Sequence, residues 1–164
     1  MTYEDFLSTR LRELLRFAVL LCGDRGLAED VVQDVLIRAH QQWGRIGDTE
    51  YPFAYVRKML VNEHLSWRRK WARQIPTAEV AAMDAVPDHA DHITDRDDLI
   101  SRLQTLPARQ RAAVVMRYFG GLTDVEIADA LGCTAGTVRG YLSRALATMR
   151  VQLATDTHLV RKDA

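Results

Sequence analysis

The segment from Thr123 to Arg150 constrains the fold most strongly, because it predicts two short helices joined by a tight turn. Thr123 and Glu126 have the spacing of a capping box, in which each side chain satisfies an orphan backbone donor at a helix start. Gly132 suits the left-handed conformation that ends a helix, and Thr134 can cap the next one. The apolar stripes at helical spacing are Val125, Ala128 and Leu131 in the first helix, and Val138, Leu142, Ala145 and Met149 in the second.

Two helices this short cannot bury their stripes alone, so they need a third, which a predicted helix from Ala108 to Tyr118 supplies. This is the helix-turn-helix pattern, in which the second helix enters the major groove of DNA. Its outward face consists of small residues, Gly136, Gly140, Ser143 and Ala147, with Arg139 and Arg144 on the two flanks. A glycine inside a helix costs about 1 kcal/mol relative to alanine, so Gly140 suggests close approach to a polyanion. The alternative is a solvated face of an all-helical protein.

Charge is segregated along the chain, although 22 basic and 22 acidic residues give a net charge of zero. The segment from Arg57 to Arg73 has six basic residues and one acid, a net charge of +5. The segment from Glu79 to Asp98 has seven acids and one arginine, a net charge of −6. A local basic patch matters more for binding DNA than the total charge does.

The N-terminal part predicts three helices in succession. An amphipathic helix covers Tyr3 to Cys22 and ends at Gly23, and Asp24 caps a second helix that extends to about Trp43. The segment Gly44 to Tyr51 is predicted to be a loop, after which Pro52 begins a third helix that extends to about Trp71. The second helix has an acidic N-terminal half, which suits its dipole and, from the residues alone, indicates a solvated face rather than a binding surface.

The third predicted helix interleaves cations with Tyr55, Trp67 and Trp71. This composition suits melted DNA, because cations hold phosphates while aromatic rings stack on unpaired bases. The alternative is a basic last turn that only answers the dipole of its own helix. The number of cations exceeds what a dipole needs, which favours a nucleic-acid surface.

The segment from Gln74 to Asp97 predicts a linker, because it has two prolines, many aspartates and no sustained period. Its acidic and histidine side chains, Asp88, His89, Asp91, His92 and Asp95, superficially resemble a metal site, but no rigid scaffold supports them. Cys22 and Cys133 are too far apart for a metal knuckle or a redox pair. We therefore expect no metal and no cofactor.

These observations predict an all-α fold with two small helical domains joined by a flexible acidic linker. The expected boundaries are 1–73 for the first domain, 74–97 for the linker, 98–152 for the helix-turn-helix domain and 153–164 for a C-terminal tail. The chain has no run of 18 apolar residues that could cross a membrane and its start has no signal-peptide core, which predicts a cytoplasmic protein.

Three stretches together resemble the sigma-70 family of RNA polymerase sigma factors, extracytoplasmic-function (ECF) group. GDRGLAEDVVQDVLIRAH is similar to the helix that grips the coiled coil of the polymerase β′ subunit, and PFAYVRKMLVNEHLSWRRKW to the helix that reads and melts the minus-ten element. LPARQRAAVVMRYFGGLTDVEIADALGCTAGTVRGYLSRALATMR is similar to the domain that reads the minus-thirty-five element. The sequence LSWRR resembles that of the actinobacterial SigE-like subgroup.

The resemblance implies three sets of site residues. Those facing core polymerase would be Asp30, Gln33, Asp34 and Arg38, which reverses the expectation of a solvated face. Those meeting minus-ten DNA would be Arg57, Asn62, Arg68, Arg69 and Trp71, with an unstacked base captured by the loop at Gly44 to Tyr51. Those meeting the minus-thirty-five duplex would be Thr137, Arg139, Ser143 and Arg144. The chain departs from the common family pattern at Ser66, Gly140 and Tyr141, which puts the promoter sequence in doubt but not the role.

The expected function is therefore an ECF sigma factor, an initiation subunit without catalytic residues and not an enzyme. Its implied partners are core RNA polymerase, through the β′ and β subunits, double-stranded and melted promoter DNA, and an anti-sigma factor. One alternative is a stand-alone helix-turn-helix regulator whose N-terminal half senses or dimerises. A second is a metal-dependent enzyme built on the linker, which no nucleophile, base or pocket signature supports.

Overall fold

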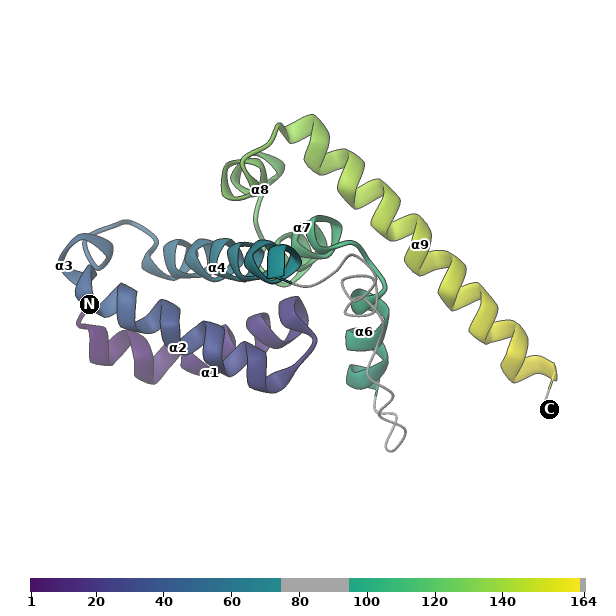
Figure 1. The fold of residues 1–164 in the computed structure, drawn as a ribbon, viewed down its shortest axis with the longest axis horizontal. Coiled ribbons are helices and arrows are strands. Elements are labelled where there is room, and N and C mark those ends of the chain that lie inside the picture. The colour runs from purple at the N-terminus through teal and green to yellow at the C-terminus, as the bar shows by residue number, and fades with distance from the viewer. Residues whose placement is uncertain (75–94, 163–164) are drawn as a thin grey trace.

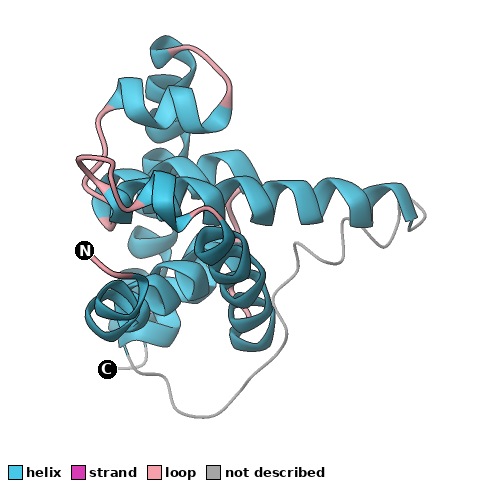
Figure 2. Ribbon diagram, turned by 90° about the vertical axis from the view of Figure 1, so that its left-hand side faces the viewer, coloured by secondary structure: helices cyan, strands magenta, loops and turns pink. Residues whose placement is uncertain are grey.

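The computed structural model describes residues 1–74 and 95–162, and every regular element within these ranges is a helix (Figures 1 and 2). The elements are α1 (Tyr3–Cys22), α2 (Arg25–Gln41), α3 (Trp43–Ile46), α4 (Pro52–Gln74), α6 (Asp95–Gln104), α7 (Ala108–Tyr118), α8 (Asp124–Leu131) and α9 (Ala135–Lys162). The predicted all-α fold is confirmed.

The N-terminal unit packs α1 and α2 side by side and lays α4 across them (Figure 1). The helix boundaries follow from local chemistry that the sequence shows. Gly23 ends α1 in the left-handed conformation with φ of 77°, and Asp24 Oδ1 accepts a hydrogen bond from the Leu27 backbone at 2.7 Å. Pro52 begins α4. The predicted end of α1 and the predicted starts of α2 and α4 are therefore confirmed.

The connection between α2 and α4 differs from the prediction. The second helix ends at Gln41 instead of Trp43, and the predicted loop begins with the short helix α3. The cause is burial: the Trp43 ring packs on Phe6 at 4.8 Å between ring centres, and Ile46 is fully buried. Two apolar anchors three positions apart favour a helical turn, which outweighs the turn preference of Gly44.

The C-terminal unit consists of α6, α7, α8 and α9. Thr123 Oγ1 accepts from the Glu126 backbone at 3.3 Å, and Glu126 Oε2 accepts from the Thr123 backbone at 2.7 Å, so the predicted capping box is confirmed. Gly132 ends α8 with φ of 64°. The helix that follows continues through position 153, where a tail was predicted, and ends at Lys162.

The buried stripes of the helix-turn-helix agree with the prediction except at one position. Val138, Leu142 and Ala145 are buried, and Met149 packs at the edge of the core. In α8, however, Val125 is 70% exposed, and the buried residues are Ile127, Ala128, Ala130 and Leu131. Val125 lies on the side of the helix opposite to the Ile127–Leu131 face, which α7 and α9 cover.

The two units pack against each other: α1 contacts α6 and α7, and α4 contacts α7 and α8. At their junction Arg111 of α7 is only 1% exposed, and its Nε donates to the Leu21 carbonyl at 2.9 Å. We call the junction of Leu21, Cys22, His64 and Arg111 the joint. The predicted linker lies outside the described residues except at its two ends, and so do Asp88, His89, Asp91 and His92; the side-chain surroundings of Asp95 are likewise not described.

Candidate polymerase and nucleic-acid interfaces

The outward face of α2 carries the four residues predicted to contact polymerase. Asp30, Gln33, Asp34 and Arg38 are all exposed, because the three valines between them face the core. Arg38 also reaches α4, where its Nη2 donates to Glu63 Oε2 at 2.5 Å. The structure therefore places the four residues on one accessible helix face, with Arg38 tied to the neighbouring helix.

A groove of about 580 Å³ lies between α1 and α2 beside this face. Its apolar floor is formed by Leu7, Leu11, Leu15, Val32, Leu36 and Ile37. Ile37 is 52% exposed, and Glu4, Glu29 and Gln33 lie among the polar residues of the groove. Of the predicted polymerase contacts, only Gln33 lines the groove. An apolar floor with carboxylates suits a protein surface that presents apolar and basic side chains.

The five residues predicted to meet minus-ten DNA do not share one face of α4. Asn62 and Arg69 are exposed and lie two turns apart on one side. Arg57 and Arg68 are half-buried and lie three turns apart on another. The Arg57 guanidinium lies 4.5 Å from the centre of the Phe53 ring, and burial lowers the pKa of Arg57. Helical spacing alone separates these two pairs.

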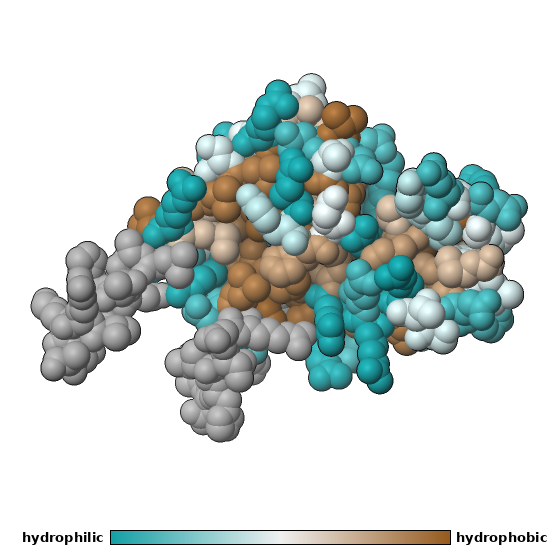
Figure 3. Space-filling model, turned by 180° about the vertical axis from the view of Figure 1, so that it is seen from behind, coloured by the Kyte–Doolittle hydropathy of each residue, from teal (hydrophilic) through white to brown (hydrophobic). Residues whose placement is uncertain are grey.

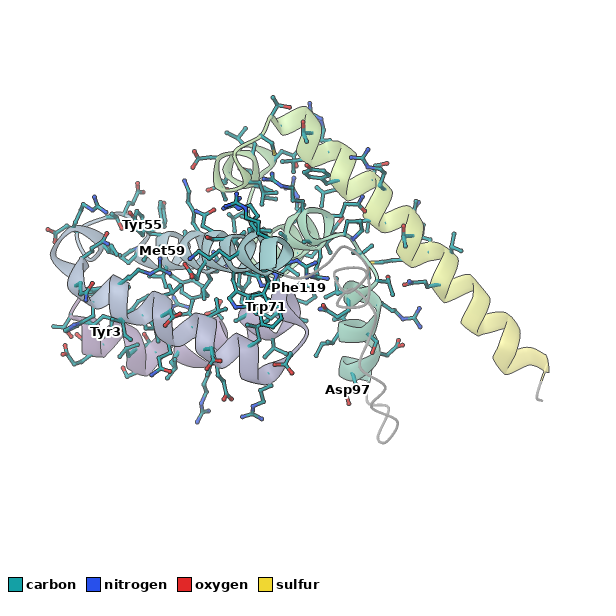
Figure 4. The ribbon with its side chains drawn as sticks, in the orientation of Figure 1. Tyr3, Tyr55, Met59, Trp71, Asp97 and Phe119 are labelled. Atoms are coloured by element: carbon teal, nitrogen blue, oxygen red, sulfur yellow. The ribbon has the colours of Figure 1, made fainter. Side chains whose placement is uncertain are left out.

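The aromatic residues of α4 lie at its two ends. The Trp67 and Trp71 rings lie 5.3 Å apart at the C-terminal end, and Trp71 is 40% exposed (Figure 4). Tyr55 lies at the other end of α4. Its hydroxyl accepts a hydrogen bond of 3.1 Å from Nη2 of Arg45, a residue of α3. Lys58 forms an ion pair with Asp129 of α8. The exposed cations and aromatic rings of α4 that a ligand can reach therefore lie together at its C-terminal end.

The outward face of α9 agrees with the geometry inferred from spacing. Gly136, Ser143 and Ala147 are exposed on the side opposite to the buried stripe, with Arg139 and Arg144 exposed on the two flanks. Thr137 is half-buried, and its backbone donates to Thr134 Oγ1 at 3.1 Å, which confirms Thr134 as a cap of α9. Local helix geometry determines this face without help from distant residues.

The joint contains two titratable groups whose importance the sequence did not reveal. Cys22 Sγ lies 3.4 Å from His64 Nδ1, and both side chains are buried. Burial, followed by the charge of Arg111, lowers the pKa of His64 to about 3. Burial raises the pKa of Cys22 to about 12. Both groups are therefore neutral at neutral pH.

Hydrophobic side chains gather near the middle of the face shown in Figure 3, while hydrophilic ones dominate its rim. Among residues 1–74 and 95–162, no three His, Cys, Asp or Glu side chains are grouped in a way that could hold a metal ion. In the same ranges, no helix combines the length and apolar character that crossing a membrane requires.

Comparison with known proteins accounts for both units. Residues 6–74 match the model of sigma-70 region 2, and residues 96–149 match the model of sigma-70 region 4. The RNA polymerase sigma-E factor of Streptomyces avermitilis is 35% identical over 152 residues, which cover 92% of this chain and 84% of that protein. The chain belongs to the sigma-70 family of RNA polymerase sigma factors.

Within that family, this sigma factor belongs to the ECF group. The ECF RNA polymerase sigma factor SigL of Mycobacterium tuberculosis is 34% identical over 145 residues, 85% of this chain and 82% of that protein. The sigma factor RpoE of Bartonella quintana, solved in complex with the anti-sigma factor NepR, has a TM-score of 0.68 and 30% identity. That match covers 93% of this chain and 99% of the solved one. The predicted family is confirmed.

Proposed function

We propose that this sigma factor binds core RNA polymerase through α2, reads and melts the minus-ten element with α4, and anchors on the minus-thirty-five duplex with α9. The observation that carries the proposal is the division of exposed charge among these three helices. The outward face of α2 is mainly acidic, whereas α4 near Arg69 and α9 at Arg139 and Arg144 expose cations. A protein surface and two nucleic-acid surfaces are thereby separated on one molecule.

The polymerase surface comprises Asp30, Gln33, Asp34 and Arg38, together with the apolar groove beside Gln33. In the proposal the β′ coiled coil docks along α2, and the β subunit contacts the C-terminal unit. Exposed carboxylates next to apolar side chains favour a partner helix with basic and apolar residues, because charge complementarity directs the encounter and apolar burial retains it.

The two DNA surfaces are assigned different tasks. Asn62, Arg69 and Trp71 are accessible in the described arrangement and meet the minus-ten strand. Arg57 packs on Phe53 of its own helix, whereas Lys58 pairs with Asp129 of α8 and reaches DNA only when that contact between the two units opens. Arg139 on one flank of α9 and Thr137 with Arg144 on the other, with Ser143 between them, meet the minus-thirty-five duplex.

In this proposal the protein itself catalyses no reaction and needs no cofactor, since polymerase supplies the chemistry of RNA synthesis. It works in the cytoplasm, where bacterial transcription takes place. Because the Bartonella quintana relative was solved with an anti-sigma factor, we further propose that a protein of that class contacts this chain and competes with core polymerase.

The test is transcription from a supercoiled template library by core polymerase with and without the protein. We expect transcripts that start at discrete new sites only when the protein is present. The variant D30K should lose most of these transcripts, whereas E13K, an equal charge reversal at an exposed position of α1, should keep them. No new transcripts, together with protection of a palindromic site by the protein alone, would establish the stand-alone regulator instead.

A further inference from the structure

Arg139 and Arg144 of α9 lie near two glycines of the same helix, Gly136 and Gly140. A Cβ atom added at Gly136 would lie 3.8 Å from Arg139 Nη2, and one added at Gly140 would lie 3.6 Å from Arg144 Nη2. Both side chains therefore fold back toward the start of the helix, which is the usual direction for long helical side chains. A Cβ at these distances would only touch the guanidinium groups, so each guanidinium lies beside a glycine and the small face is not bare.

Arg139 has an anchor outside its own helix. Its Nη1 lies 3.7 Å from Oδ2 of Asp124, the first residue of α8. Asp124 Oδ1 accepts a hydrogen bond from Arg117 of α7, which holds the carboxylate in place. One partly exposed carboxylate thus connects α7, α8 and α9, the three helices that pack together around the helix-turn-helix (Figure 1).

Arg144 has a different anchor. Its guanidinium carbon lies 5.6 Å from the centre of the Tyr141 ring, within the range of cation–π attraction. Tyr141 is itself half-buried and packs against the core, so the ring is a fixed platform. The two arginines are therefore held by unlike groups, Arg139 by a carboxylate and Arg144 by an aromatic face.

We propose that Asp124 and Tyr141 are positioning residues that fix the directions of Arg139 and Arg144, and thereby decide which base pairs of the upstream promoter duplex this sigma factor accepts. The inference rests on the proposed function of α9. A mobile arginine binds any phosphate within reach and does not discriminate among sequences. Bidentate contact with guanine O6 and N7 requires a guanidinium whose plane and direction are set.

The capping box of α8 is formed by Thr123 and Glu126, so Asp124 is not the residue that caps this helix. Its carboxylate is directed at two arginines instead. Asp129 offers a matched control, since it is an acid of the same helix that pairs with Lys58 of α4 and not with α9. Comparing variants of Asp124 and Asp129 therefore distinguishes a role of Asp124 in base-pair discrimination from a general effect of removing one negative charge.

The test uses holoenzyme and a pool of promoter templates in which the upstream element is randomised and transcripts are sequenced. We expect D124N to reduce the preference at one base-pair position by about fivefold or more, and Y141L to reduce it at a different position. D129N and Y141F, which keep the anchors, should give the wild-type preference. D124E keeps the charge and should restore most of the preference lost in D124N.

A double variant shows whether Asp124 acts through Arg139: D124N should remove no further preference when R139A is already present. If D124N and Y141L weaken all templates equally and leave the preferences unchanged, the two residues are structural and the inference is overturned. If the wild-type holoenzyme itself shows no preference in the upstream element, the proposed function of α9 fails. These two failures are distinguished by the wild-type profile alone.

Discussion

The two helices assigned to promoter DNA, α4 and α9, hold their cations in different ways. In α4, Arg57 is half-buried on Phe53 and Lys58 pairs with α8, because α4 lies between α1, α2, α7 and α8. In α9, Arg139 and Arg144 are exposed, one on each flank of the outward face. One basic helix, α4, is therefore also a structural centre, whereas α9 has a face that is free for contact.

The largest expected effect tests the structural side of this comparison. R111M removes the buried cation that donates to the carbonyls of Leu21 and Leu106 at the joint behind α4. Because the carbonyls lose charged donors, we expect the free energy of unfolding to fall by about 3 kcal/mol. Urea titration followed by circular dichroism measures it. R144M on the exposed flank of α9 should change it by less than about 0.5 kcal/mol, and equal losses would remove the distinction.

The next effect depends on pH and arises at the same joint. The folded protein holds His64 neutral with a pKa of about 3, against an ordinary value of 6.5, so between these values the unfolded chain binds more protons. Stability therefore falls as pH drops below 6.5, by about 2 kcal/mol at pH 5 from this group. Between pH 7 and pH 5, the free energy of unfolding of the H64L variant should fall less steeply than that of the wild type. An equally steep fall would mean that His64 does not titrate in this way.

A smaller effect probes the start of the helix-turn-helix. T123A removes the hydroxyl that caps α8, and we expect a loss of about 1 kcal/mol. Thr148 is a matched control, because its hydroxyl only donates to the Arg144 carbonyl within α9. T148A should leave the unfolding midpoint nearly unchanged. Because α8 supports the outward face of α9, we expect T123A also to weaken promoter binding, which would show that this face depends on the fold beneath it.

The smallest effect concerns the ion pair between the two units. Lys58 is 39% exposed and Asp129 is 72% exposed, so K58M should cost less than about 1 kcal/mol in urea titration. Higher salt should not change the difference between K58M and wild type by more than this amount. A larger loss would show that the pair, rather than the joint, holds the two units together.

Much of the fold could be predicted from local patterns. The capping box at Thr123, the left-handed Gly23 and Gly132, and the stripe through Val138 and Ala145 all depend on residues near them in sequence. The outward face of α9 could be predicted for the same reason. Helical spacing also separates Asn62 from Arg57, although the five α4 residues were expected to act as one set.

The rest depends on contacts between distant residues. Gly44 signals a turn, yet burial of Ile46 and packing of Trp43 on Phe6 produce α3. Nothing local distinguishes Arg111, which is buried at the joint, from the other arginines of its helix. The anchor of Arg139 is equally hidden, because Asp124 lies in another helix and its role needs three helices in place. The anchor of Arg144 is local, because Tyr141 precedes it by three residues in the same helix.

The most direct test of the account is a footprint of the promoter at single-nucleotide resolution, with permanganate to detect unpaired thymines. We predict that core polymerase and the protein together make thymines reactive near the start site and protect a duplex segment upstream. R139A/R144A should remove the upstream protection, and W71A should reduce the thymine reactivity. Upstream protection by the protein without core polymerase, with no reactive thymines in the complete mixture, would contradict the assignment of two DNA surfaces to one initiation factor.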